Sequence, residues 1–322
     1  MTRRKQVMAV LQWLFIVAVV AFIAVQVFRQ RVAVADAASA IGWAGIVGSL
    51  VATVAGLGAT CVAWRMLLAG FGHPLPPAAA SGIFFVAQLG KYLPGSVWPY
   101  VAQARMGRGY RVPASRSAAA GAIFVLLHCA TGALVAAVTL PLAGDDTIKQ
   151  RFGWLPWLVP LFLLALHPRA IHSGLSVLHR VTRRGTAPPL LPWSRIGAAL
   201  GALLIAWICY GAALFALVSP LAGGSVRAMV LSTGGFALAW TAGFVAAAVL
   251  VVAAPAGLGV REVALYSVLA HVLSGGTATA VVVMSRIGQI IGDVIWAGAG
   301  ALWARRRAHA VASDLSADVS AA

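Results

Sequence analysis

The stretch IGWAGIVGSLVATVAGLGATCVAW, residues 41 to 64, contains 24 consecutive residues without an Asp, Glu, Lys or Arg. An α-helix rises about 1.5 Å per residue, so roughly 20 apolar residues cross the hydrocarbon core of a bilayer. The whole chain has the same character, because 61% of its 322 residues are hydrophobic and only 10% are charged. Soluble domains contain roughly 45 to 50% apolar residues. The sequence therefore predicts an all-α polytopic membrane protein.

Similar apolar runs recur along the chain and predict about eight membrane crossings. They lie at residues 7 to 28, 41 to 64, 117 to 141, 153 to 167, 196 to 219, 228 to 253, 262 to 273 and 278 to 304. The first run is longer than the roughly 7 to 15 apolar residues of a signal-peptide core. We therefore expect it to be a permanent membrane helix and not a cleaved signal peptide. Residues 1–307 are expected to form one integral membrane domain, and the small and polar residues 308–322 a disordered cytoplasmic tail.

Basic residues concentrate on one side of this predicted topology. That side receives sixteen of the 24 Lys and Arg: Arg3, Arg4, Lys5, Arg65, Arg105, Arg108, Arg111, Arg116, Arg169, Arg180, Arg183, Arg184, Arg195, Arg305, Arg306 and Arg307. The other side receives Arg29, Arg31, Lys149, Arg151 and Arg227. Because positive loops resist translocation, we expect both termini to be cytoplasmic. Topology and anionic lipid head groups explain the net charge of +17, so we expect no nucleic-acid partner.

The usual signatures of catalysis are missing from the sequence. Cys61, Cys129 and Cys209 lie far apart within apolar runs, which is not the spacing of a disulfide or a metal site. No Walker loop, HExxH, GxSxG or CxxC motif occurs. The sequence therefore predicts no metal and no cofactor, and it favours a transporter-type protein without covalent chemistry.

Five ionisable residues fall inside predicted membrane segments: Lys91, Arg261, Glu262, Arg286 and Asp293. A charge at membrane depth costs on the order of 2.5 to 3.5 kcal/mol on insertion scales, so each needs a partner, a wet cavity or an end position. Their sum is +1, from three cations and two carboxylates. This balance predicts an anionic guest.

Three polar residues form one stripe on the last predicted helix. Arg286, Gln289 and Asp293 are separated by three and four residues, which places them on the same helical face. Gly288 and Gly292 between them have the spacing that lets another backbone approach closely. Mutual neutralisation of Arg286 and Asp293 within the bundle is an open alternative to a binding role.

Two apolar segments are interrupted by Gly and Pro, near residues 78–108 and 251–265. In the first, Lys91 precedes Pro94 and Gly95, and Ser96 is a plausible N-cap for a returning helix. In the second, Pro255, Gly257 and Gly259 precede Arg261 and Glu262. Paired interruptions of this kind are a pointer to a transporter binding site, and the N–H groups that start a half-helix attract anions. We therefore predict two re-entrant segments; ordinary surface turns are the alternative.

The same motifs carry a resemblance to a known family. GKYLPGSVW (residues 90 to 98), AQARMGR (102 to 108) and PAGLGVRE (255 to 262) resemble the membrane domain of lysylphosphatidylglycerol synthases and its stand-alone relatives. Ala256 departs from the pattern, where a second glycine is more usual. In the synthases such a domain is associated with moving aminoacylated phospholipid between leaflets. No aminoacyl-transferase domain follows residue 307 in this sequence, so we do not expect synthase activity.

The resemblance implies a lipid translocase, or flippase, for an anionic phospholipid or a polyprenyl-phosphate-linked lipid in a bacterial inner (plasma) membrane. Lys91, Arg261 and Arg286 would attract the phosphate, while Glu262 and Asp293 would orient the arginines or carry protons. Backbone N–H groups after Pro94 and near Gly257 to Gly259 would assist. Neutral hydrogen bonds would come from Tyr92, Ser96 and Gln289, and Gly95 would shape the first break.

Two other classes of function stay open at this point. Asp145 and Asp146 are adjacent acids in a predicted external loop, and such a pair can hold a metal or act as a base in a membrane-embedded transferase. Lys149 and Arg151 nearby also fit a simple solvated charge cluster. A non-catalytic partner of a cell-envelope enzyme, or a homo-oligomer, would use the long Ala- and Gly-rich helices for packing.

Overall fold

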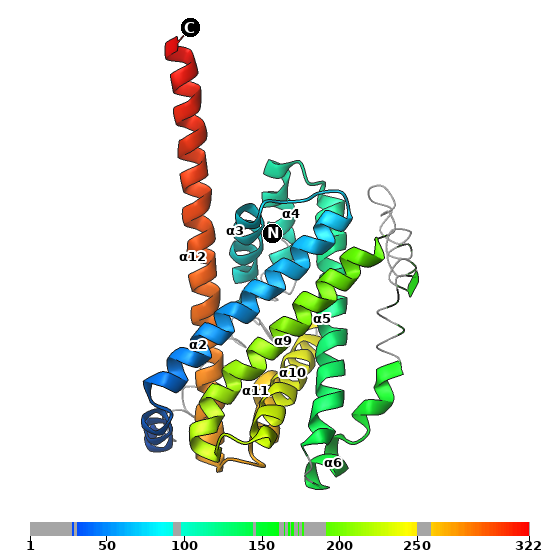
Figure 1. Ribbon diagram of the computed structural model, residues 1–322, viewed down its shortest axis with the longest axis vertical. Coiled ribbons are helices and arrows are strands. Elements are labelled where there is room, and N and C mark those ends of the chain that lie inside the picture. Colours follow the sequence, from blue (N-terminus) through cyan, green and yellow to red (C-terminus); the bar gives the residue numbers. More distant parts are fainter. Residues whose placement is uncertain are drawn as a thin grey trace, which may run out of the picture.

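The computed structural model describes residues 31–92, 98–143, 146–160, 191–249 and 259–321, together with residues 28, 164, 167, 169–170, 173 and 176. All regular structure in these ranges is helical (Figure 1). Five of the described helices are long and apolar enough to cross a membrane. They are α2 (Arg31–Gly70), α5 (Ala114–Leu142), α9 (Trp193–Ala222), α10 (Val226–Val249) and the first part of α12 (Gly275–Ala321). The predicted all-α polytopic membrane fold is confirmed.

The predicted eight crossings are not confirmed in the described part of the chain. The run at 262–273 is not a crossing, because α11 (Val260–Leu269) has only 10 residues and so a length of about 15 Å, half of the hydrocarbon core. The chain turns at residues 270–274, where His271 and Ser274 interrupt the apolar run, and enters α12. The predicted crossing at 7–28 lies almost wholly outside the described residues. Of the run at 153–167, mainly the short helix η3 (Leu155–Leu158) is described.

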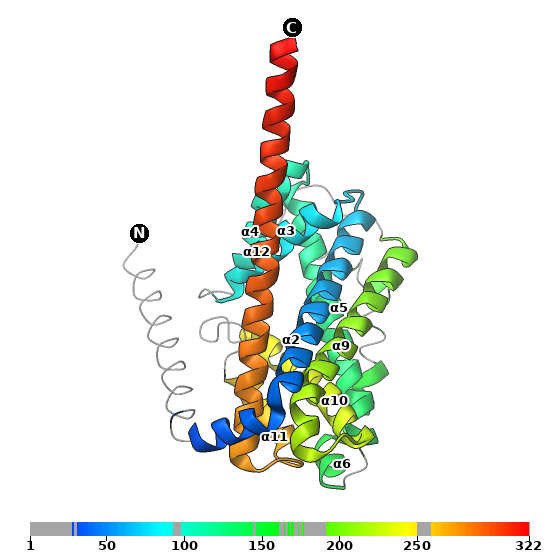
Figure 2. The same ribbon diagram turned by 60° about the vertical axis from the view of Figure 1, so that its left-hand side comes forward.

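The helices end at two opposite faces of the molecule. One face comprises the start of α2, the short helix α6 (Asp146–Phe152) and the turns at 223–225 and 270–274 (Figures 1 and 2). It is called the opposite end below, because it lies opposite the basic end defined next. The other face, called the basic end, comprises residues 65–76, 105–116 and 191–195. Its described basic side chains are Arg65, Arg105, Arg108, Arg111, Arg116 and Arg195. At the opposite end they are Arg31, Lys149 and Arg227.

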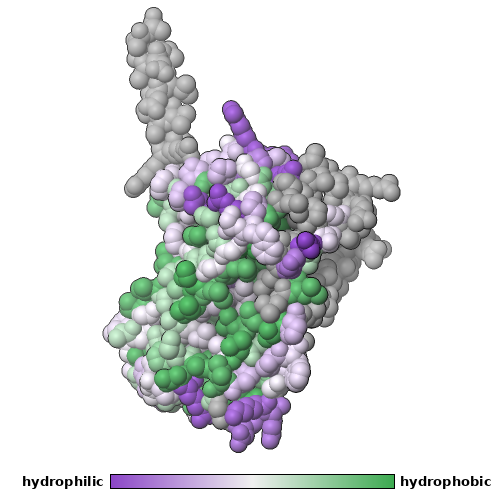
Figure 3. All heavy atoms as spheres, turned by 45° about the vertical axis from the view of Figure 1, so that its right-hand side comes forward, coloured by the Kyte–Doolittle hydropathy of each residue, from purple (hydrophilic) through white to green (hydrophobic). Residues whose placement is uncertain are grey.

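An apolar surface separates these two ends. Figure 3 shows hydrophobic residues over the middle of the visible face and hydrophilic residues at both ends. Ile205 and Ile208, near the middle of α9, have exposed aliphatic side chains. Trp43 near the start of α2 and Trp157 in η3 are highly exposed, and Trp193 begins α9. Tryptophan favours the two interfaces of a bilayer, so these rings fit the borders of a lipid-facing band.

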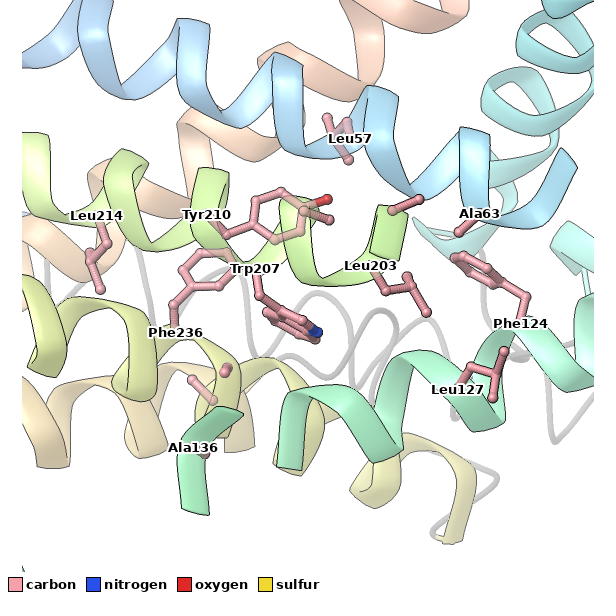
Figure 4. Packing of buried hydrophobic residues seen from close by; sticks show 14 of the residues in the cluster. Leu57, Ala63, Phe124, Leu127, Ala136, Leu203, Trp207, Tyr210, Leu214 and Phe236 are labelled. Atoms are coloured by element: carbon pink, nitrogen blue, oxygen red, sulfur yellow. The ribbon is translucent and has the colours of Figure 1, made fainter. Parts of the chain in front are cut away.

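Helix α9 forms the centre of the packing. It lies against α2 along most of its length and also contacts α10 and α5. Figure 4 shows Leu203, Trp207, Tyr210 and Leu214 of α9 facing Leu57 and Ala63 of α2, Phe236 of α10, and Phe124, Leu127 and Ala136 of α5. The indole Nε1 of Trp207 donates to Thr131 Oγ1 at 3.0 Å. The buried indole N–H is thus satisfied across the α9–α5 contact.

The first interrupted segment consists of two helices too short to cross. Helix α3 (Pro77–Gln88) has 12 residues and α4 (Trp98–Gly107) has 10, or about 18 and 15 Å. The turn η1 (Leu89–Tyr92) ends the inward arm. Because α3 follows the loop at the basic end and α4 leads to η2 (Arg108–Tyr110) at the same end, the segment enters and leaves on one side (Figure 1). This arrangement agrees with the predicted re-entrant segment.

Helix α3 is held directly against α12. A Cβ added to Gly300 would lie 2.7 Å from the Cα of Gly82, so the two backbones meet where neither residue has a side chain. One turn away, the rings of Phe85 and Trp296 stack with centroids 4.8 Å apart. These contacts fix the depth of η1 relative to α12.

The described part of the second interrupted segment runs back along α10 toward the opposite end. Gly259 begins α11 with a φ of 91°, a backbone conformation that strongly favours glycine. Helix α11 packs along α10, where Gly235 leaves room for Val268. After α11, the turn at residues 270–274 leads to α12, which begins at Gly275. The described part of the segment therefore returns to the end from which α10 starts.

Helix α12 continues beyond the apolar region. Its candidate membrane span is Gly275–Trp303, but the helical backbone extends to Ala321 and projects past the other helices (Figures 1 and 2). The helical backbone runs through Ala321, and the predicted division into a membrane domain at 1–307 and a disordered tail at 308–322 stays a prediction. Alanine, the strongest helix former, is frequent there.

Candidate functional site

The polar stripe of α12 lies at the centre of its membrane span. Gln289 is 14 residues from Gly275 and 14 from Trp303, the two ends of that span. Gln289 is 8% exposed and Asp293 only 2%. Since Arg286 and Asp293 are seven residues apart, they are separated by about 10 Å along the helix axis. The stripe thus places both signs of charge near the middle of the membrane.

Asp293 is bound by the first interrupted segment. Its Oδ2 lies 2.6 Å from the Nζ of Lys91 and accepts a hydrogen bond of 2.6 Å from the hydroxyl of Tyr92. The Lys91 side chain is 30% exposed, and its ammonium lies over the Tyr92 ring, 5.3 Å from the centroid. The other oxygen, Oδ1, is buried and has no hydrogen-bond partner among the described residues.

Arg286 is bound by the second interrupted segment. Its Nε lies 3.7 Å from Oε1 of Glu262, and both side chains are mostly buried. Oε2 of Glu262 accepts a 2.7 Å hydrogen bond from the N–H of Gly259, the residue that begins α11. Glu262 therefore both caps its own helix and contacts α12. Arg286 and Asp293 thus each have an ion-pair partner on a different interrupted segment.

Arg261 is the third cation of the cluster. It is 6% exposed, and its guanidinium lies over the ring of Phe236 with Cζ 5.0 Å from the centroid. Its Nη2 is buried without a hydrogen-bond acceptor among the described residues. An arginine carries five N–H donors, and a buried donor without an acceptor is costly. This guanidinium can therefore donate a hydrogen bond to an additional anionic oxygen.

These charges act on one another as a single cluster. Lys91 is within electrostatic range of Asp293, Arg286 and Arg261, and Arg261 is within range of Glu262 and Arg286. With all five groups ionised the cluster carries +1. The structure thus brings together the predicted residues Lys91, Tyr92, Arg261, Glu262, Arg286 and Asp293, with Gln289 on the same face of α12 and Gly259 at the start of α11.

Four predicted site residues cannot be placed. Pro94, Gly95 and Ser96 lie between η1 and α4, and Gly257 precedes α11; all four are outside the described residues. The predicted contribution of backbone N–H groups at these breaks therefore stays a prediction.

Two residues that sequence reasoning missed complete the surroundings. Tyr210 of α9 is within electrostatic range of Asp293 and Arg261, and its ring stacks on that of Phe236. Both aromatic residues lie in uninterrupted apolar runs, where nothing distinguishes them from ordinary core residues. The only available signal was the scarcity of tyrosine, of which the chain has five.

Asp146, predicted with Asp145 as the acidic pair of a transferase, lies outside the charge cluster. Asp146 lies in α6 at the opposite end, where its side chain is 93% exposed and its Oδ1 is 3.9 Å from Lys149 Nζ. Asp145 is outside the described residues. No group of three or more His, Cys, Asp or Glu suited to a metal ion occurs in the described part of the chain. Asp146 thus belongs to a solvated charge pair.

Comparison with known proteins identifies a family but no individual relative. No curated protein and no solved structure gives a significant match. The family described as "Lysylphosphatidylglycerol synthase TM region" matches residues 9–297, most of the chain. This range includes both interrupted segments and the charged stripe of α12. The chain is therefore a member of the lysylphosphatidylglycerol synthase transmembrane-region family.

Proposed function

We propose that the protein is a lipid translocase that moves an anionic phospholipid or a polyprenyl-phosphate-linked lipid across a bacterial inner membrane. One observation carries the proposal: a charge cluster of net +1 lies near the centre of a membrane span, and the buried Arg261 Nη2 has no acceptor among the described residues. Family membership supports a lipid-related membrane function in general terms.

The charge balance favours an anionic guest. Burying cations at membrane depth costs several kcal/mol, and a lipid phosphate would offset part of this cost by accepting hydrogen bonds from Arg261 and Lys91. Arg261 would supply donors for the phosphate, and Lys91, the more exposed cation of the two ion pairs in the cluster, would meet it first. Arginine binds phosphate in a forked geometry, while lysine acts as a point charge.

The interrupted segments supply a route between the two sides. The first enters from the basic end and the second returns to the opposite end, and both contact α12 at the polar stripe. Irregular backbone at membrane depth survives only where protein or a polar cavity surrounds it. Small movements of either segment relative to α12 would expose the cluster to one leaflet at a time.

The basic end is assigned to the cytoplasm in this proposal, which makes both termini cytoplasmic. In a variant lacking the three native cysteines, Gln150→Cys at the opposite end should react with an impermeant thiol reagent added to intact cells. Gly109→Cys at the basic end should react only after permeabilisation. The reverse labelling pattern would overturn the orientation.

The function is tested by lipid exchange in proteoliposomes. Purified protein should accelerate the movement of fluorescent phosphatidylglycerol or a fluorescent polyprenyl-phosphate-linked lipid between leaflets, but not that of phosphatidylcholine. Arg261→Gln should slow the movement about tenfold or more, because a charged hydrogen bond contributes about 1.5 to 3 kcal/mol. Arg108→Gln, an exposed arginine at the basic end, is the matched control. Folded protein that accelerates neither anionic lipid would refute the function.

A further inference from the structure

We propose that Asp293 binds a proton when an anionic lipid displaces it from Lys91, so that lipid and proton cross the membrane together. This inference rests on the proposed function and identifies the energy source of the same site. The two carboxylate oxygens of Asp293 have unequal environments. Oδ2 contacts Lys91 Nζ and Tyr92 Oη at 2.6 Å each, whereas the buried Oδ1 has no partner among the described residues.

The exposure of the pair sets the order of events. Lys91 is 30% exposed and Asp293 is 2% exposed, so an entering phosphate reaches the ammonium and not the carboxylate. When the ammonium turns to the phosphate, the carboxylate loses its nearest cation. A buried charge left without its partner costs several kcal/mol, which favours protonation of the carboxylate.

The exchange balances in charge and in protons. In the empty protein, the Lys91 ammonium pairs with the Asp293 carboxylate. A lipid phosphodiester with one negative charge takes the ammonium, and one proton from the entry side forms an O–H bond at Oδ1. The Tyr92 hydroxyl continues to donate to Oδ2. Release on the other side reverses both steps, so one lipid charge and one proton are transported with no net charge.

Among the described residues, no second carboxylate is in direct contact with Asp293. The charged and titratable described groups around it are Lys91 and Tyr92 from η1, Tyr210 from α9, Arg261 from α11 and Arg286 from α12. Next to it on α12, Gly292 is packed by Thr53, Val54 and Leu57 of α2, none of which titrates. Asp293 is therefore the acid that the bound phosphate would replace.

Two other residues are weaker candidates for the proton. Glu262 uses Oε2 to bind the N–H of Gly259, and its Oε1 faces Arg286, so its protonation would also weaken the start of α11. His128 of α5 lies within electrostatic range of Lys91, but its ring is stacked on Trp240 with centroids 3.9 Å apart. Its two nitrogens have no partner among the described residues and contact no carboxylate.

The experiment imposes a proton gradient on proteoliposomes that contain wild-type protein and fluorescent phosphatidylglycerol. A gradient of about one pH unit should enrich the lipid in the leaflet on the alkaline side, by at most about tenfold for one-to-one exchange. A potassium diffusion potential set with valinomycin, without a pH difference, should produce no enrichment. A lumenal pH dye should report proton entry that depends on the lipid.

Variants assign the effect to Asp293. In Asp293→Asn, the ratio of transport rates with and without the gradient should fall to one, whatever the basal rate. The control Asp146→Asn changes an exposed acid at the opposite end and should keep the wild-type ratio. If the ratio falls to one in His128→Asn but keeps its wild-type value in Asp293→Asn, the proton binds at a residue other than Asp293. That result would overturn the inference.

Lipid movement by the wild-type protein tests the proton exchange even if a variant fails to fold. Lipid movement that ignores the gradient would overturn the proton exchange and leave the proposed function standing. Enrichment driven by voltage alone would also overturn it, because the exchange carries no net charge. Absence of any protein-dependent lipid movement would overturn both proposals.

Discussion

The two interrupted segments deliver opposite charges to the same helix. The α3–η1–α4 segment brings a cation, Lys91, to a carboxylate of α12, whereas α11 brings a carboxylate, Glu262, to a guanidinium of α12. The first pair is close, at 2.6 Å, and is reinforced by the Tyr92 hydroxyl. The second pair is longer, at 3.7 Å, and Glu262 divides its oxygens between Arg286 and its own helix.

This difference indicates separate roles for the two segments. The first segment is charge-matched at its contact with α12, and under the proposed function this contact, called the lock below, is the one that a competing anion must open. The second segment also contributes Arg261, whose Nη2 has no acceptor among the described residues. Once the two ion pairs are counted as neutral, the surplus positive charge of the cluster is that of Arg261.

The largest effect on stability is expected from removal of the lock. Lys91→Met keeps the length of the side chain but leaves a buried carboxylate without its cation, which should cost about 3 kcal/mol. The double variant Lys91→Met, Asp293→Asn should recover part of this loss. Thermal unfolding in one detergent measures both. A single variant as stable as the double would show that the pair contributes little.

A somewhat smaller loss is expected where α3 meets α12. In Gly300→Ala the new Cβ would lie 2.7 Å from Gly82 Cα, so a backbone must move, at a cost of about 2 kcal/mol. Gly288→Ala on the same helix meets no described atom within 4 Å and should be neutral or slightly stabilising. Equal unfolding temperatures for the two variants would contradict the close approach.

Removal of one hydroxyl tests the reinforcement of the lock. Tyr92→Phe deletes the hydrogen bond to Asp293 Oδ2 and should cost about 1.5 kcal/mol. In a Lys91→Met background the hydroxyl is the remaining donor to that carboxylate from η1, so its removal should cost more there. Additive losses would show that the two donors act independently.

The smallest effect is expected at the longer ion pair. Glu262→Gln removes the charge but keeps an oxygen that can accept from the Gly259 N–H, so the loss should be on the order of 1 kcal/mol. Glu262→Ala removes the cap as well and should lose about 1 kcal/mol more. A loss for Glu262→Gln that exceeds that for Lys91→Met would reverse the ranking of the two segments.

The clustering of the charged residues was predictable from the sequence, whereas the number of crossings was not. Apolar length identified the long helices, and the cost of charge at membrane depth selected the residues that form the cluster. The pairing was not predictable, because the spacing of Arg286 and Asp293 suggested mutual contact. Their actual partners come from segments that are distant in sequence and are positioned by tertiary contacts such as that between Gly82 and Gly300.

Some failures have identifiable physical reasons. The run at 262–273 has the composition of a crossing but is ended after one half-length helix by a turn at residues 270–274. Tyr210 and Phe236 lie beside the cluster. They belong to predominantly apolar helices, whose sequences do not mark these two residues as special. Composition alone does not distinguish a residue that faces a polar cluster from one that faces the core.

The central claim is that an anionic head group enters the cluster between η1, α11 and α12. The most direct measurement is photo-crosslinking in nanodiscs with phosphatidylglycerol that carries a reactive group on its head, followed by mass spectrometry of the labelled peptides. We expect labelling of residues 89–92 and 259–269 that is lost in Arg261→Gln and absent with a phosphatidylcholine probe. Labelling confined to the two ends of the molecule, equal for both lipids, would contradict the account.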